Sequence, residues 1–269
     1  MEVFSKSDIG LVRTQNQDDF RFGVISPSCV WAVVCDGMGG ANGGNIASAM
    51  ACEAFVAAVE QFVASDKVRR GHATEGDFSS MLAHAVAGAN LNVYKATERD
   101  KSLRGMGTTL VAALVVGDVL YAVNVGDSRL YLYSRGRLTQ ITRDHSLVQY
   151  LMDTGKLTQE EAKDYPNRNV ITRAVGIERN IEADIFSVDL SRLGGGTCAL
   201  LCSDGLSGYV ANEDILRLLT EGGVGKDTWD GEAAAAALVD AANEAGGADN
   251  VTVVLMALDD KKTNNSEVR

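Results

Sequence analysis

The 269-residue chain is predicted to be an α+β protein. Short apolar runs rich in valine, leucine and tyrosine recur along it, and two long alanine-rich segments show helical spacing of their apolar residues. Three of the runs, at 108–117, 119–127 and 129–134, follow one another without an intervening helix. Because strands joined by short turns pair antiparallel, these runs are expected to form antiparallel sheet.

Six strands are predicted from the apolar runs, which are punctuated by glycine or aspartate. They are WAVVCD (31–36), TTLVAALVVG (108–117), VLYAVNVGD (119–127), RLYLYS (129–134), CALLCSD (198–204) and VTVVLMAL (251–258). Gly117-Asp118 and Ser134-Arg135-Gly136 indicate hairpin turns between neighbouring runs.

Four helical segments are predicted. The alanine-rich segments span about 45–64 and 78–99, with Asp77 as the N-cap of the second. The polar segment between them, SDKVRRGHATEG, is expected to be a surface loop. Shorter helices are expected from Asn212 and over 231–245.

Two further segments lack long apolar runs. Residues 142–176 are predicted to form short helices joined by loops, and such an insertion is typical of a flap that contacts substrate. The polar tail, residues 259–269, is expected to be disordered.

The composition excludes several classes of protein. The net charge is −11 and no basic cluster is present, which argues against a nucleic-acid partner. The N-terminal residues lack the apolar core of a signal peptide, and no apolar run is expected to span a membrane. The five cysteines are odd in number and include no C-x-x-C pair, which fits a reduced cytoplasm.

Aspartates stand at the ends of four apolar runs. They are Asp36, Asp127, Asp204 and Asp249. A single strand-end aspartate is usually solvated, but four of them indicate a shared role. Converging carboxylates raise one another's pKa unless a cation holds them, and oxygen ligands favour Mg²⁺ or Mn²⁺ over zinc. The three histidines are too scattered along the chain for a typical zinc site.

Other catalytic motifs are incomplete. The glycines in VVCDGMGGANGG (33–44) let the backbone approach whatever Asp36 faces, but they do not complete a dinucleotide-binding fingerprint. No P-loop motif occurs. Ser207 lies in GLSGY and not in a nucleophile elbow, so serine-nucleophile catalysis is disfavoured.

Eight segments in order resemble the motifs of the type 2C metal-dependent protein phosphatases (the PPM family), bacterial branch. They are DIGLVRTQNQDDF, VCDGMGG, GMGTTLVAAL, VNVGDSRLYLY, ITRDHSLVQYLMDTG, NRNVITRAVG, LLCSDGLSG and GGADNVTVVL. The resemblance runs from about residue 4 to residue 258 and implies one catalytic domain over 1–258. It also implies a β-sandwich of two antiparallel sheets flanked by helices, with a metal centre at one end.

The resemblance assigns roles to individual residues. It implies that Asp36 bridges two Mn²⁺ or Mg²⁺ ions, that Gly37 offers its backbone carbonyl to the first, and that Asp204 and Asp249 complete the second. A third ion would be held by Asp127 and Asp204. Two such metals would activate a water to attack phosphorus in line.

Arg13 and Asp18 are the remaining residues with an implied catalytic role. Arg13 matches the arginine that grips the substrate phosphate, because its planar guanidinium can bind two oxygens at once. The alternative for Arg13 is an ordinary surface ion pair. Asp18 is expected to orient waters at the metals.

Two positions depart from the family pattern. Gln17 stands where many relatives have glutamate, and Met38 stands where animal relatives have a histidine thought to be the general acid. His145 could instead protonate the leaving oxygen, but we prefer its interpretation as a loop histidine that caps a helix.

The leading hypothesis is a cytoplasmic, monomeric phosphatase that acts on phosphoserine and phosphothreonine in proteins and opposes a bacterial Ser/Thr kinase. A pseudophosphatase that only binds is disfavoured because all four aspartates are present. A phosphohydrolase of small phosphoesters is the other alternative, and the long flap at 142–176 favours a macromolecular substrate over it.

Overall fold

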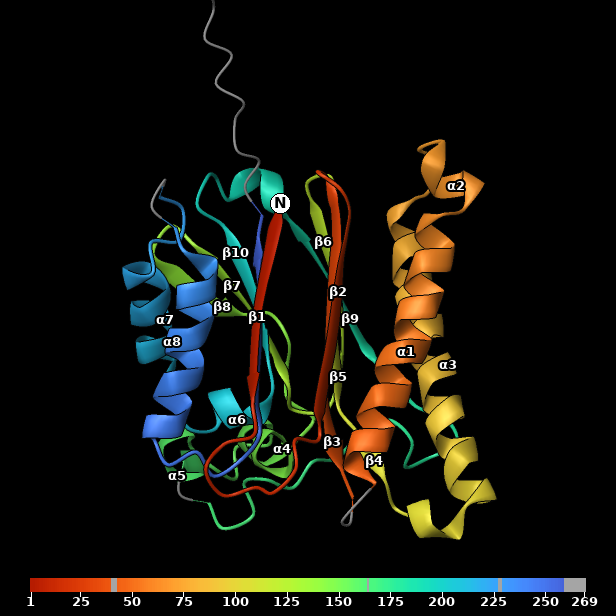
Figure 1. Cartoon of the computed structure of the whole chain (residues 1–269), viewed down its shortest axis with the longest axis vertical. Coiled ribbons are helices and arrows are strands. Elements are labelled where there is room, and N and C mark those ends of the chain that lie inside the picture. The colour runs from red at the N-terminus through yellow and green to blue at the C-terminus, as the bar shows by residue number, and fades with distance from the viewer. Residues whose placement is uncertain (40–42, 164, 227–228, 259–269) are drawn as a thin grey trace, which may run out of the picture.

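The centre of the protein is a pair of antiparallel sheets flanked on both outer faces by helices (Figure 1). This is seen in a computed structural model that describes residues 1–39, 43–163, 165–226 and 229–258. The predicted α+β class and the sandwich implied by the family resemblance are both confirmed. The predicted tail at 259–269 lies outside the described residues.

The first sheet has five strands. Their order is β1 (Glu2–Asp8), β11 (Val251–Ala257), β10 (Cys198–Cys202), β7 (Arg129–Ser134) and β8 (Arg137–Gln140). The predicted hairpin between β7 and β8 is confirmed, because Ser134 pairs with Arg137 and the two residues between them have positive φ.

The second sheet has six strands. Their order is β2 (Asp18–Ser26), β3 (Cys29–Met38), β5 (Leu110–Val116), β6 (Val119–Val125) and β9 (Asp184–Asp189), and the short β4 (Gly107–Thr108) pairs with β3. The hairpin predicted at Gly117-Asp118 is confirmed by the pairing of Val116 with Val119.

Two helical layers cover the sheets. Helices α1 (Gly44–Val63) and α3 (Glu75–Arg99) pack on the second sheet. Helices α7 (Asn212–Glu221) and α8 (Gly231–Glu244) pack on the first sheet, with the short α6 (Asp204–Ser207) below them in Figure 1. The run of β3 is continuously apolar because both of its faces are buried. Val34 faces the other sheet, whereas Val33 faces the helices.

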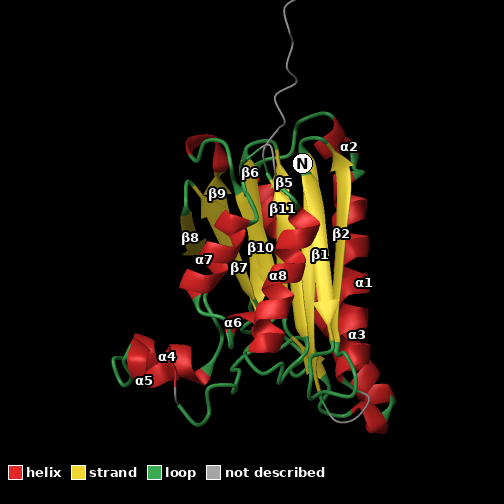
Figure 2. Ribbon diagram, turned by 60° about the vertical axis from the view of Figure 1, so that its left-hand side comes forward, coloured by secondary structure: helices red, strands yellow, loops and turns green. Residues whose placement is uncertain are grey.

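The flap contains the two short helices α4 (Leu147–Asp153) and α5 (Gln159–Lys163), as the sequence predicted. Figure 2 shows them projecting at the end of the sandwich where α6 lies. The remaining short elements are α2 (Asp66–Arg69) and the 3₁₀ turns η1 (Lys101–Leu103) and η2 (Leu190–Arg192).

Three predictions on the helices were wrong. Thr74, not Asp77, is the N-cap of α3, and Asp77 completes a capping box from the third position. The expected loop before α3 contains α2, which Ser65 caps. Helix α1 is long and apolar enough to cross a membrane by length and composition, although no run was expected to be. In the structure its apolar residues pack against β3 and α3 in the core.

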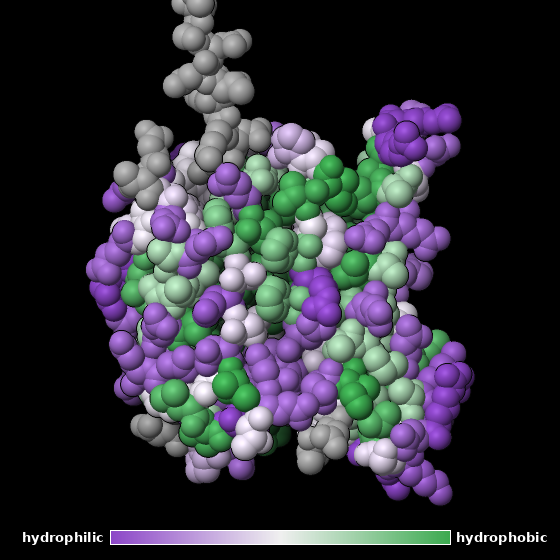
Figure 3. Space-filling view, viewed as in Figure 1, coloured by the Kyte–Doolittle hydropathy of each residue, from purple (hydrophilic) through white to green (hydrophobic). Residues whose placement is uncertain are grey.

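Four strands were not predicted, namely β1, β2, β8 and β9. All four are at the ends of their sheets, where only one face is well covered. Hydrophobic surface is visible over β2 in Figure 3, where Phe22, Val24 and Ile25 are exposed. Such strands lack the continuous apolar run by which the buried strands were predicted.

Candidate functional site

Two of the predicted aspartates lie side by side on neighbouring strands. Asp36 is near the end of β3, and Asp18 at the start of β2 is its direct antiparallel partner. Hydrogen bonds to Thr108 of β4 and to Thr109, the residue that follows β4, fix the backbone of Asp36. Its N–H donates to Thr109 Oγ1 (2.9 Å), and its carbonyl accepts from the Thr109 N–H and from Thr108 Oγ1, both at 2.8 Å.

Asp204 approaches the same point from the first sheet, as the first residue of α6 after β10. Its carboxyl group is hydrogen-bonded to that of Asp36. Ser203, just before it, donates from Oγ to Asp18 Oδ2 at 2.8 Å. Strand ends of both sheets therefore converge on one carboxylate cluster.

Burial is the largest cause of the raised pKa values in this cluster. It raises the pKa of Asp18 to about 7, and hydrogen bonds from Thr252 and Ser203 only partly oppose it. Burial and the charges of Asp18, Asp204 and Asp127 raise the pKa of Asp36 well above its ordinary value. Burial also raises the pKa of Asp204. The Asp36–Asp204 hydrogen bond raises the pKa of Asp36 and lowers that of Asp204.

Asp127 follows β6 and extends the cluster toward the flap. Burial, followed by the charges of Asp204 and Asp144, raises its pKa to about 8. Asp127 and Asp204 line one cavity of about 680 Å³, whose other walls come from the flap and from the start of α7. The structure thus places Asp127 near Asp204, at the edge of the carboxylate cluster that faces the flap.

Arg13 and Asp249 form an ion pair at the edge of the cluster. The distance between Arg13 Nη2 and Asp249 Oδ2 is 2.7 Å, and the two side chains are 49% and 25% exposed. The hydrogen bond to Asp249 is the largest cause that raises the pKa of Arg13, and the nearby Asp36 and Asp204 raise it further. Arg13 therefore faces the cluster, but its partner in the structure is a predicted metal ligand.

Gly37 is buried directly after Asp36, and only glycine fits there. A Cβ atom at Gly37 would collide with the carbonyl oxygens of Gly44 and Gln17. Its N–H donates to the Gln17 carbonyl at 3.1 Å. The close approach of these backbones is a physical reason for the glycines after Asp36.

The donor set fits a hard divalent cation. Asp18 Oδ1 and Asp204 Oδ1 are buried without a hydrogen-bond partner, and a buried carboxylate oxygen is costly unless something compensates it. Oxygen atoms alone are the ligands that Mg²⁺ and Mn²⁺ prefer. Within the described ranges, however, no three acidic, histidine or cysteine side chains are already arranged around a common ion position. Asp204 is hydrogen-bonded to Asp36, and Asp249 forms an ion pair with Arg13. Because these carboxylates face protein groups in the structure, the set of metal ligands stays a prediction.

Asn250 is a residue of this site that the sequence reasoning missed. It is only 5% exposed and joins the Arg13 loop to Asp249. Its Nδ2 donates to the carbonyls of Ile9 (2.9 Å) and Gln15 (3.0 Å), and its Oδ1 accepts from the Gln17 N–H (2.8 Å). The only signal in the sequence was its position next to Asp249 in GGADN.

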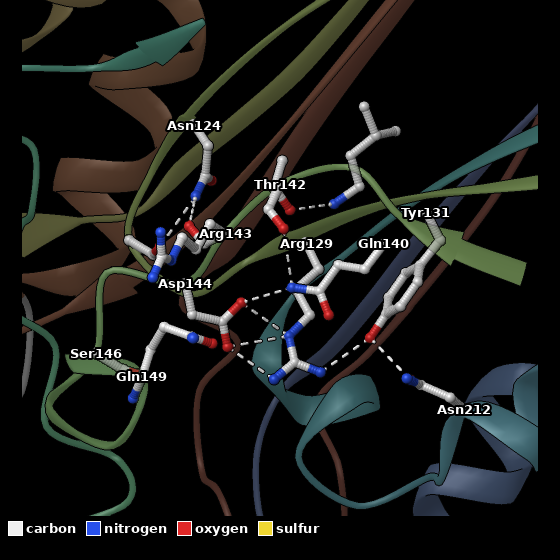
Figure 4. A network of polar contacts seen from close by, with 12 residues as sticks. Asn124, Arg129, Tyr131, Gln140, Thr142, Arg143, Asp144, Ser146, Gln149 and Asn212 are labelled. Carbon is white, nitrogen blue, oxygen red and sulfur yellow. Dashed lines mark hydrogen bonds and ion pairs between the residues drawn. The ribbon is translucent and has the colours of Figure 1, made fainter. Parts of the chain in front are cut away.

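A partly buried polar network joins the root of the flap to the first sheet (Figure 4). Arg129 binds Asp144 through Nε and Nη2 at 2.7 to 3.1 Å, and its Nη1 donates to Tyr131 Oη at 2.9 Å. Tyr131 Oη in turn donates to Asn212 Oδ1 at 3.1 Å. Gln140 Nε2 also donates to Asp144, at 3.0 Å. Because Arg129 and Asp144 line the cavity with Asp127, the network holds one wall of the site.

His145 does not cap a helix, so its preferred interpretation was wrong. Ser146 is the N-cap of α4. His145 is 6% exposed, and its Nδ1 accepts from the Gly126 N–H at 3.1 Å. Its Nε2 lies 3.2 Å from Asp184 Oδ2 and from Arg173 Nη1. Both ring nitrogens are therefore engaged, and Nδ1 holds the turn that carries Asp127.

Comparison with known proteins agrees with this architecture. The profile of the protein phosphatase 2C family matches residues 12–240. The protein phosphatase PhpP of Streptococcus pneumoniae is 35% identical over 263 residues, which cover 97% of this chain and 99% of the relative. The crystal structure of the Mycobacterium tuberculosis serine/threonine phosphatase PstP/Ppp superposes with a TM-score of 0.81 at 36% identity, covering 96% of this chain and 99% of that one.

A third comparison concerns metals. The catalytic domain of the serine/threonine protein phosphatase PstP in complex with two manganese ions gives a TM-score of 0.75 at 35% identity, covering 94% of this chain and 96% of that one. The chain belongs to the protein phosphatase 2C family. The predicted family and enzyme class, a metal-dependent protein phosphatase, are confirmed.

Proposed function

We propose that this chain hydrolyses phosphoserine and phosphothreonine on proteins at the carboxylate cluster. The observation that supports this most strongly is the convergence of buried aspartates from both sheets beside a half-exposed arginine. Relatives named as serine/threonine phosphatases at similar length give the substrate class its support.

The proposed cofactor is Mn²⁺ or Mg²⁺. Asp36, the Gly37 carbonyl, Asp204 and Asp249 would hold two core ions, and Asp127 with Asp204 would hold a third. When bound, such ions supply Lewis acidity and a water of lowered pKa at neutral pH. They also offset the repulsion between an acidic site and an anionic substrate.

Phosphate binding and the orientation of a water are assigned to side chains of this chain. The guanidinium of Arg13 is exposed enough to bind two oxygens of a phosphate at once. Asp18 is held by Ser203 and keeps Oδ1 free of protein partners, so it can orient a water by accepting its hydrogen. Met38 has no proton to give and His145 is buried with both nitrogens engaged, so we assign protonation of the leaving oxygen to a water.

We further propose one catalytic domain over residues 1–258, with the flap at 142–176, acting as a monomer in the cytoplasm against the products of a Ser/Thr kinase. All five cysteines are buried and free, which supports a reducing compartment.

The test compares a phosphothreonine peptide with p-nitrophenyl phosphate, each with Mn²⁺, with Mg²⁺ and with excess chelator. We expect turnover of both substrates with metal, a higher kcat/KM for the peptide, and collapse in chelator. Full turnover in chelator, with metal content measured, would contradict the metal role. Turnover of the small ester alone would favour a phosphohydrolase, and peptide binding without turnover would favour a pseudophosphatase.

A further inference from the structure

A second cavity, separate from the one beneath the flap, lies next to Met38. Its volume is about 540 Å³, and apart from Met38 its wall comes from residues 171–182, which run from the end of the flap toward β9. The lining includes Met38, Ile171, Arg173, Ile177, Glu178 and Glu182.

The cavity is held close to the carboxylate cluster by backbone pairing. Gly37 pairs with Thr108 of β4, and Thr108 forms a bridge with Val175, with N–H···O distances of 3.0 and 2.8 Å. Neighbouring strands are about 4.8 Å apart, so the backbone at Val175, next to the lining residue Ala174, lies roughly 10 Å from the strand that carries Asp36. An extended peptide advances about 3.3 Å per residue, so a substrate side chain two or three residues from the phosphorylated one would reach the cavity.

The wall is also fixed before any substrate binds. Asn90 of α3 is buried, and its Nδ2 donates to the carbonyls of Glu178 (2.9 Å) and Arg179 (3.1 Å). Its Oδ1 accepts from the Gly176 N–H at 2.7 Å. Ile177 packs over Gly107, where a Cβ would come within 2.9 Å of its side chain. The cavity is therefore built into the fold by a buried side chain of a different element.

Its lining combines aliphatic walls with negative charge. Met38, Ile171 and Ile177 contribute apolar surface. The positive charge of Arg173 is matched by Asp184, 2.9 Å away. Glu178 and Glu182 are exposed, and neither carboxylate has an ion-pair or hydrogen-bond partner among the described residues. The rim therefore carries two uncompensated negative charges over an apolar interior.

We propose that this cavity binds a lysine or arginine side chain located two or three residues from the phosphorylated residue of the substrate. The aliphatic stem of such a side chain packs on the apolar walls, and its charged head meets Glu178 and Glu182 at the rim. An aliphatic side chain would leave the two carboxylates unpaired, and an acidic one would be repelled. The proposal rests on the proposed phosphatase function and adds a substrate preference to it.

The experiment uses phosphothreonine peptides that carry arginine, norleucine or glutamate at each of three positions on either side. We expect arginine at one position to raise kcat/KM about fivefold to tenfold over norleucine, a range set by exposed ion pairs with two carboxylates, since the norleucine stem packs on the same walls. The Glu178→Gln/Glu182→Gln variant should lose this advantage and keep its turnover of p-nitrophenyl phosphate. Thr172→Trp, which narrows the cavity and keeps both glutamates, should lose it too.

The control variant is Glu53→Gln/Glu60→Gln, which removes two exposed charges from the outer face of α1 and should keep the arginine preference. Binding of the same peptides to Asp36→Asn is measured by fluorescence anisotropy, so the preference is read even without turnover. Equal binding of the arginine and norleucine peptides would overturn the proposal. So would an arginine preference that persists in the glutamine variant, or that disappears equally in the control. Absence of turnover on every substrate, with the binding preference intact, would contradict the proposed function and leave the subsite supported.

Discussion

The metal-free protein is expected to lose stability as the pH rises from 7 to 8. Burial, followed by the charges of Asp204 and Asp144, raises the pKa of Asp127 to about 8, and burial is also the main cause that raises the pKa of Asp36. An aspartate in an unfolded chain has a pKa of about 3.9. Each raised carboxyl therefore stabilises the fold by binding a proton that the unfolded chain lacks. This contribution is complete below about pH 4 and is lost as the pH rises through the folded-state pKa.

The size of the loss follows from the raised pKa of Asp127. A fully titrating carboxyl changes the free energy of unfolding by about 1.4 kcal/mol per pH unit. Between pH 7 and 8, Asp127 is partly titrated and contributes about 1 kcal/mol. This corresponds to a fall in Tm of roughly 2–4 °C for a protein of this size, and Asp36, whose pKa is also raised, acts in the same direction. His145 does not interfere, because burial lowers its pKa and moves its titration below this window.

The assay is thermal or urea unfolding in chelator at pH 7.0, 7.5 and 8.0, repeated with saturating Mg²⁺. The cation should remove most of the pH dependence, because it takes the place of the protons and adds its own binding energy. Asp127→Asn, which keeps the shape of a neutral carboxyl group, should reduce the dependence in chelator by about 1 kcal/mol between pH 7 and 8. A stability in chelator that is constant or rises from pH 7 to 8 would refute the reasoning, as would an unchanged dependence in Asp127→Asn.

Three substitutions test other parts of the site. Arg13→Ala should raise KM for a phosphopeptide about tenfold or more by removing a charged phosphate contact, while Mn²⁺ affinity, measured by calorimetry, should not fall. Asp144→Ala leaves Arg129 without its charge partner, so the free energy of unfolding in urea should drop by about 3 kcal/mol, and Arg129→Met should recover part of it. Asn250→Ala leaves three backbone groups unpaired, and should lower stability by about 2 kcal/mol and raise KM with Arg13 still present.

The buried strands were predictable from the sequence, and the strands at the sheet ends were not. β3, β10 and β11 are covered on both faces, so nearly every residue is apolar. β1 (EVFSKSD) and β8 (RLTQ) are covered on one face or are very short, so their composition resembles that of a loop. The caps show a similar limit, because Thr74 and Asp77 both take part in one capping box and only the structure shows which of them begins α3.

The candidate site, like the fold, was predictable only in part. The aspartates were found because an acidic residue at the end of an apolar strand conflicts with its surroundings, and four conflicts of one kind indicate a common cause. The residues that hold them carry no such signal. Asn250 and the pair formed by Arg129 and Asp144 are ordinary polar residues until the fold brings their partners together. His145 was misinterpreted because its partner, the Gly126 N–H, is a backbone group that every residue has.

Arg13 connects the acidity of the site with its proposed substrate. The chain has a net charge of −11, and the cluster adds buried carboxyl groups, so a phosphoprotein would be repelled without a local source of positive charge. Arg13 is that source in the structure, but its guanidinium is bound to Asp249. A divalent cation on Asp249 would compete with Arg13 for that carboxylate. The pair is half-exposed and therefore weak, so the exchange is easy in energetic terms. Cation binding would thus leave Arg13 available to a phosphate, and this coupling gives a physical reason for the proposed metal ligand Asp249 and the proposed phosphate-binding Arg13 to be neighbours.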